Sequence, residues 1–156
     1  MQIRLAQEAD LPTLAALYRQ TVFAWGPQHY TLAQTAAWAS FAADAAQFRA
    51  FILEVTTFVA CDRASILGFA GIDSNGHIAS VYVRHDCLHQ GIGSALMQTV
   101  LDHAQETGLQ RLYAEASEFS LGLFQKFDFH RYDTEIVERK GVQFERYLVE
   151  RQRQKF

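Results

Sequence analysis

The chain has 156 residues, of which 49% are hydrophobic, and it carries a formal net charge of −3 at pH 7. A chain of this length buries roughly 70% of its unfolded surface, so we expect a single domain over residues 1–156. The alternation of predicted strands and helices makes it an α/β domain. The weak negative charge argues against nucleic-acid binding. No apolar run reaches the roughly 18 residues of a membrane span and no signal peptide precedes the first strand, so we expect a cytoplasmic protein with no membrane partner.

The hydrophobic periodicity predicts a strand, three helices, three strands, a helix, a strand, a helix and a closing pair of strands. Pro12 suits the first turn of the first helix, while Thr31 and Asp44 are expected to cap the second and third. Asn75-Gly76 predicts a tight turn with positive φ at both residues. The strands are expected at residues 2–5, 51–61, 65–73, 77–83, 111–115, 132–139 and 142–149, and the last two helices at 91–107 and 117–127.

The most informative segment is a strand ending at Val83, a seven-residue connector, and the turn Gly91-Ile92-Gly93-Ser94 at the start of an apolar helix. The first turn of a helix has unpaired N–H groups and the positive end of the helix dipole, so this turn suits a pyrophosphate. Gly108 is expected to end the helix. Its buried face should carry Ile92, Leu96, Val100 and Ala104.

Three classes of phosphate site compete for this turn. A Walker loop needs Lys followed by Ser or Thr after its second glycine, whereas Gly93 is followed by Ser94 and Ala95. A dinucleotide fingerprint needs a third glycine, where this chain has Leu96, although Glu115 lies about where a ribose-binding acid would. The interpretation as a nicotinamide-dependent oxidoreductase is therefore less well supported, but it stays open. The third class is an acyl-coenzyme A loop, which fits the spacing without adjustment.

The chain resembles the GNAT N-acetyltransferases over nearly its whole length. Residues 3–11 are similar to the opening strand and first helix of that family, 66–72 to its third strand, 82–93 to its motif A, and 116–129 to its motif B. Segments 29–39 and 140–142 are similar to the bacterial YafP-like branch. The resemblance implies a single GNAT-like domain with a mixed, mostly antiparallel sheet, a central parallel pair of splayed strands, and flanking helices.

The resemblance also implies acetyl-CoA as the acetyl donor and a primary amine as the acceptor, joined by direct attack in a ternary complex. Two positions depart from the family pattern: Leu88 replaces the usual Arg or Gln, and Phe124 replaces the Tyr credited with protonating the leaving thiolate. The expected cofactor-binding residues are Val81, Tyr82, Val83, Leu88, His89, Gln90, Gly91, Ile92, Gly93, Ser94, Ser117 and Phe124.

Acetyl transfer requires a neutral amine, so a base or a chain of waters must remove a proton from the ammonium. Glu115 is the preferred base because it lies at the end of a strand that borders the expected thioester. His77 is the second candidate, although an extended strand would place it roughly 16 Å from Tyr82. Tyr82 and Tyr113 are the nearest hydroxyls for a general acid. No metal is needed.

Some interpretations stay open in the sequence. Without the motif B Tyr, the chain could be a non-catalytic acyl-CoA-binding module, and a homodimer is allowed. The aromatic segment from Phe23 to Phe41 could form core or line a pocket. Cys61 and Cys87 suggest neither a disulfide nor a metal site. The basic ending is interpreted as a solvated tail, with Arg146, Arg151, Arg153 and Lys155.

Overall fold

The computed structural model describes residues 1–153, and its order of strands and helices is the predicted one. The strands are β1 (Gln2–Leu5), β2 (Thr56–Asp62), β3 (Ser65–Ile72), β4 (Ile78–Val83), β5 (Arg111–Ala116), β6 (His130–Arg139) and β7 (Val142–Gln152). The helices are α1 (Leu11–Trp25), α2 (Leu32–Ala39), α3 (Ala45–Leu53), α4 (Ile92–Glu106) and α5 (Leu121–Lys126).

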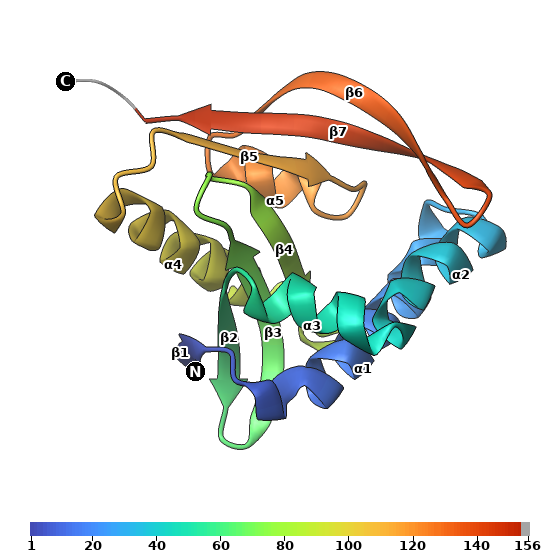
Figure 1. Cartoon of the computed structure of the whole chain (residues 1–156), viewed down its shortest axis with the longest axis horizontal. Helices are drawn as coiled ribbons and strands as arrows, with labels where there is room; N and C mark the ends of the chain where they lie inside the picture. The colour runs from blue at the N-terminus through green and yellow to red at the C-terminus, as the bar shows by residue number, and fades with distance from the viewer. Residues whose placement is uncertain (154–156) are drawn as a thin grey trace.

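The strands form two antiparallel sheets, ordered β1-β2-β3-β4 and β5-β7-β6. One parallel bridge, between His77 and Tyr113, joins β4 to β5 within the described part of the chain. The Tyr113 N–H donates to the Gly76 carbonyl over 3.0 Å at this point. Beyond the bridge β4 and β5 part toward their C-terminal ends (Figure 1). This is the splayed parallel pair that the sequence predicted.

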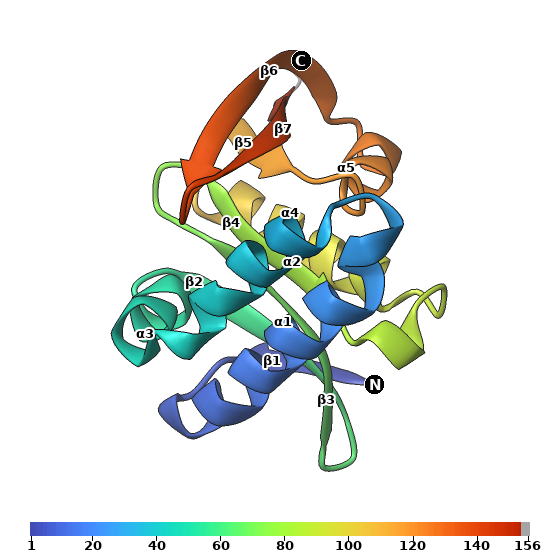
Figure 2. The ribbon, with the colours of Figure 1, turned by 90° about the vertical axis from the view of Figure 1, so that its right-hand side faces the viewer.

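Helices cover both faces of the strands and divide the core in two. Helices α1, α2 and α3 lie on one face and α4 behind it (Figure 2). The core around α4 contains Leu96, Met97 and Val100, each fully buried, while the core around α1 contains Leu14 and Ile52. The predicted inner face of the cofactor helix is confirmed, because Ile92, Leu96, Val100 and Ala104 are all buried.

Local signals fixed most helix ends as expected. The Thr31 hydroxyl accepts from the Gln34 N–H over 3.0 Å, and the Gln34 side chain accepts from the Thr31 N–H over 2.9 Å, a reciprocal cap that begins α2. Asp44 caps α3 by accepting from the Gln47 N–H over 3.0 Å. Gly108 takes a φ of 75° after α4, as the end of that helix requires.

Four local predictions were wrong. Residues 51–53 continue α3 instead of starting β2, because Ile52 packs one turn after Phe48 in the core. The motif B helix starts at Leu121 and not at residue 117, because the Ser117 hydroxyl accepts from the N–H groups of residues 119 and 120 and forms a turn. In the 74–76 turn only Gly76 has positive φ.

The fourth error concerns the basic C-terminal segment. Arg146 and Arg151 belong to β7 and are not part of a solvated tail. The Arg146 guanidinium binds the Glu135 carboxylate, and Arg151 donates to the Phe127 carbonyl over 3.0 Å. Lys155 lies outside the described residues.

Candidate active site

The gap between β4 and β5 exposes backbone groups of β4. The Arg84 N–H donates to the Leu67 carbonyl on β3 over 2.8 Å. Because backbone groups alternate in direction along a strand, the N–H and C=O groups of Val81 and Val83 point away from β3 and toward the gap. The Val83 carbonyl accepts from the Thr21 hydroxyl over 3.2 Å. The remaining groups form a polar edge suited to an extended, peptide-like ligand.

The glycine turn lies where β4 leads into α4. Gly91 has a φ of 83° and precedes the first helical residue, and no side chain caps the helix there. A Cβ on Gly93 would lie 3.3 Å from Leu123 Cδ2, a tight contact with the end of a flexible side chain, and an ordinary 3.5 Å from Val83 Cγ2. His89 and Gln90 are exposed at the rim, whereas Leu88 is half-buried. The first-turn N–H groups are therefore open to an anion.

A lysine that the sequence analysis did not single out lies at this turn. Lys126, in the last turn of α5, places its Nζ 2.8 Å from the Ser94 Oγ. A cation at the positive end of a helix is electrostatically unfavourable unless an anion lies beside it. The sequence signal was present in motif B, since Lys126 follows Phe124 by two residues. Its pairing with Ser94 depended on the packing of α5 against α4.

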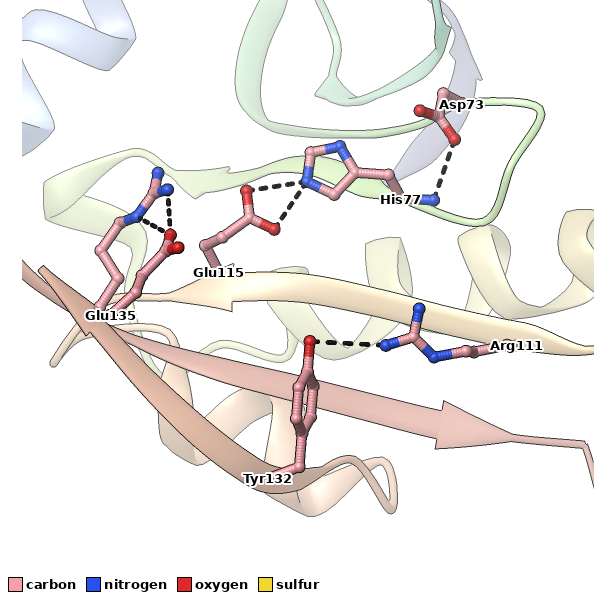
Figure 3. A network of polar contacts seen from close by, with 7 residues as sticks. Asp73, His77, Arg111, Glu115, Tyr132 and Glu135 are labelled. Carbon is pink, nitrogen blue, oxygen red and sulfur yellow. Dashed lines mark hydrogen bonds and ion pairs between the residues drawn. The ribbon is translucent and has the colours of Figure 1, made fainter. Parts of the chain in front are cut away.

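The two candidate bases form one pair. His77 Nε2 lies 3.0 Å from both Glu115 Oε1 and Glu115 Oε2, and the two side chains are 28% and 25% exposed (Figure 3). The hydrogen bond that the His77 ring donates to the Glu115 carboxylate raises the pKa of His77 and lowers the pKa of Glu115. From the sequence these two residues are alternatives, but the structure brings them together across the gap, at its closed end.

Asp73 fixes the backbone from which His77 projects. Its carboxylate accepts the N–H of His77 over 2.9 Å and that of Asn75 over 2.8 Å. With Nε2 turned to Glu115, the other ring nitrogen, Nδ1, stays outside that contact. The arrangement therefore has a carboxylate that orients an imidazole and a second nitrogen able to accept a proton.

Tyr82, the first candidate acid, points toward the helices. Its hydroxyl accepts from Trp38 Nε1 over 3.2 Å, and its ring lies 4.6 Å from that of Tyr18 and 5.3 Å from that of Phe69. Burial raises the pKa of Tyr82, so the hydroxyl stays protonated at neutral pH. Tyr113 instead packs its ring 5.1 Å from that of His77.

The motif B candidates are held by packing and turn contacts. Phe124 is 3% exposed and meets Phe129 edge to face at 5.1 Å in the core around α4. The Ser117 hydroxyl is occupied within its own turn, where its backbone N–H also donates to Ser120 Oγ over 2.9 Å. Contact of either residue with a cofactor stays a prediction.

The aromatic segment divides between core and gap. Tyr30 and Trp38 join Phe119 and Phe144 in a layer of rings with centroids 5.6 to 6.2 Å apart. The Tyr30 hydroxyl accepts from the Glu118 N–H over 3.2 Å, which ties the α1–α2 segment to the turn after β5. Phe41 instead packs in the α1 core and Phe23 is 44% exposed, so only part of the segment lies at the gap.

Within residues 1–153, none of the helices combines the length and the apolar character of a membrane span. No group of three or more His, Cys, Asp or Glu side chains there has a metal-binding arrangement. Cys61 and Cys87 are both buried with free thiols.

Residues 27–150 match the acetyltransferase (GNAT) domain family, which is more than half of the chain. The chain belongs to the GNAT acetyltransferase family. As a GNAT acetyltransferase it uses acetyl-CoA as its acetyl donor. Family membership decides against the nicotinamide-dependent oxidoreductase.

Known GNAT proteins resemble this chain over nearly its whole length. The uncharacterized N-acetyltransferase YafP of Escherichia coli is 25% identical over 149 residues, which cover 96% of this chain and 94% of that protein. A GCN5-related N-acetyltransferase from Rhodopseudomonas palustris superposes with a TM-score of 0.93 at 24% identity, over 97% of this chain and 94% of that one. PaiA from Thermoplasma acidophilum, solved with coenzyme A, has a TM-score of 0.79 at 15% identity, over 98% of this chain and 100% of that one.

Proposed function

We propose that this GNAT acetyltransferase transfers the acetyl group directly to a primary amine in a ternary complex. The observation that carries the proposal is the layout of the β4–β5 gap. The glycine turn at residues 91–94 lies at its open end, and the His77–Glu115 pair lies at its closed end. A donor lying along β4 would present its thioester between these two features.

Backbone groups of β4 would position the donor. The N–H and C=O groups of Val81, and the N–H of Val83, face the gap and can bind a pantetheine arm as a neighbouring strand would. One of these N–H groups can also polarise the acetyl carbonyl, a kind of contact whose removal costs roughly 2.7 to 4 kcal/mol in other enzymes. The N–H groups of residues 91–94 would hold the phosphates.

We assign proton removal to His77, held by Glu115, in place of Glu115 alone. A carboxylate with a lowered pKa is a weak base, whereas an imidazole with a raised pKa is a stronger one. His77 accepts a proton only in its neutral form, so the rate should rise as the pH increases through its pKa. Glu115 would orient the ring and stabilise the imidazolium that forms.

The experiment is thiol release from acetyl-CoA against a panel of amines and peptides, using wild type, His77→Gln and Glu115→Gln. We expect His77→Gln to lower kcat by at least 10²-fold and Glu115→Gln by about tenfold, with the KM for acetyl-CoA unchanged in both. The melting temperature controls for folding. Wild-type kcat in His77→Gln across pH 6 to 9 would refute this role.

Family membership decides against the non-catalytic acyl-CoA-binding module that the sequence left open. A cytoplasmic location, a homodimer and the absence of nucleic acid among the partners remain predictions from the sequence.

A further inference from the structure

A row of charged side chains crosses the three-stranded sheet and continues over the gap. Glu135 on β6 is directly opposite Arg146 on β7. Arg146 Nε lies 2.9 Å from Glu135 Oε1, and Arg146 Nη2 contacts the same oxygen. Glu115 on β5 is opposite Leu148 on β7. Arg146 is therefore the diagonal neighbour of Glu115 on the same face of the sheet, within reach of a long side chain.

Arg146 is thus a cation that two carboxylates can share. In the structure its hydrogen bonds go to Glu135, while both Glu115 oxygens face His77 (Figure 3). All the partners are partly buried, since the side chains of Arg146 and Glu135 are 31% and 35% exposed. A pair in this setting is screened less than one on an open surface.

The charges around His77 come from three directions. Glu115 faces it from β5 and Asp73 from the turn before β4, and both favour the protonated ring. Arg146 approaches from β7 and opposes protonation. The neighbouring ring of Tyr113 carries the Arg111 guanidinium 4.7 Å from its centroid, and that guanidinium is paired with a carboxylate of β7.

We propose that Glu135 is a positioning residue for the proton acceptor: by holding Arg146, it leaves the Glu115 carboxylate free to bind His77. The catalytic consequence rests on the function proposed above for His77. Without Glu135, Arg146 would turn to Glu115 and compete with His77. An uncompensated cation would then lie beside the imidazole, and both effects lower the pKa of His77.

The direct test is an NMR titration of the His77 ring in wild type, Glu135→Gln and Arg146→Met. The resonance is assigned among the six histidines by its loss in His77→Gln. A unit charge about 7 Å away shifts a titration by roughly 0.4 pH unit in bulk water and by up to about 1.7 pH units at an effective dielectric of 20, so about half a unit is the smallest shift to expect in this partly buried setting. We expect the midpoint to fall by at least that amount in Glu135→Gln and to rise in Arg146→Met.

Glu138→Gln is the matched control, because Glu138 is an exposed carboxylate on the same strand. It should leave the His77 midpoint unchanged. Glu135→Asp should restore much of the wild-type value, since a carboxylate is retained. The proposal is overturned if the midpoints in Glu135→Gln and Arg146→Met both lie within about 0.1 pH unit of wild type.

The rate profile links the titration to catalysis. In Glu135→Gln the acid limb of kcat should move to lower pH by the shift seen in the NMR titration, with the KM for acetyl-CoA unchanged. If His77→Gln keeps full turnover, the proposed function of His77 fails. The NMR titration still decides the role of Glu135 in that case, because it does not depend on turnover.

Discussion

Lys126 offers the sharpest test of the donor site. Lys126→Met removes the ammonium beside Ser94 and keeps most of the apolar length of the side chain. At about 4 Å, a unit charge pair is worth ~1 kcal/mol in water and ~4 kcal/mol at an effective dielectric of 20. Lys126 is exposed, so the lower end applies, and a phosphate with one to two charges gives about 1 to 2 kcal/mol, or roughly 5- to 30-fold in Kd.

Calorimetric titration with coenzyme A and with dephospho-coenzyme A should measure this effect and locate it. Lys140→Met is the matched control, because Lys140 lies in the β6–β7 turn and the side-chain change is identical. A loss that disappears with dephospho-coenzyme A would place Lys126 at the 3′-phosphate, and a loss seen with both would place it at the pyrophosphate. Affinities within twofold of the control for both ligands would refute the reasoning.

Three further predictions follow from the site. Gly91→Val should weaken acetyl-CoA binding at least tenfold with the fold retained, because a φ of 83° is strained for a branched residue, and unchanged calorimetric affinity would contradict it. Phe124→Tyr should leave turnover similar or raise it, while the hydroxyl buried beside Phe129 should lower the free energy of unfolding by about 1 to 3 kcal/mol. A tenfold loss in kcat would argue against the acid position. The His77–Glu115 pair should stabilise the fold by about 1 kcal/mol between pH 4.5 and 6.5. The contribution of Glu115 is lost as pH falls through its lowered pKa and that of His77 as pH rises through its raised pKa, so Glu115→Gln should flatten the dependence of melting temperature on pH.

Features that depend on neighbouring residues were predictable from the sequence. The caps at Thr31 and Asp44, the end of α4 at Gly108 and the buried face of α4 each follow from residues a few positions apart. The order of elements and the glycine turn follow in the same way, because periodicity and glycine conformation are properties of short segments.

Contacts that depend on sheet register were not predictable. The sequence separated His77 from Glu115 by 38 positions, and only the parallel bridge to β5 brings their side chains within 3.0 Å. Arg146 lies within the predicted strand 142–149 but was also grouped with a basic, solvated tail, whereas its contact with Glu135 depends on which residue lies opposite it in the β6–β7 ladder. Lys126 and Ser94 likewise meet only because α5 packs beside α4.

Because the Tyr113 amide bonds across the bridge between the two sheets, its hydrogen exchange reports whether the sheets separate. Within residues 1–153 the two sheets share no other ladder contact, so the Tyr113 N–H becomes accessible to solvent deuterium whenever the two halves separate. Amides inside β2, β3 or β7 would stay protected during such an event, because their partners move with them. A donor bound along both β4 and β5 would hold the two sheets together. The deuterium uptake of the Tyr113 amide should then slow more than that of the neighbouring amides.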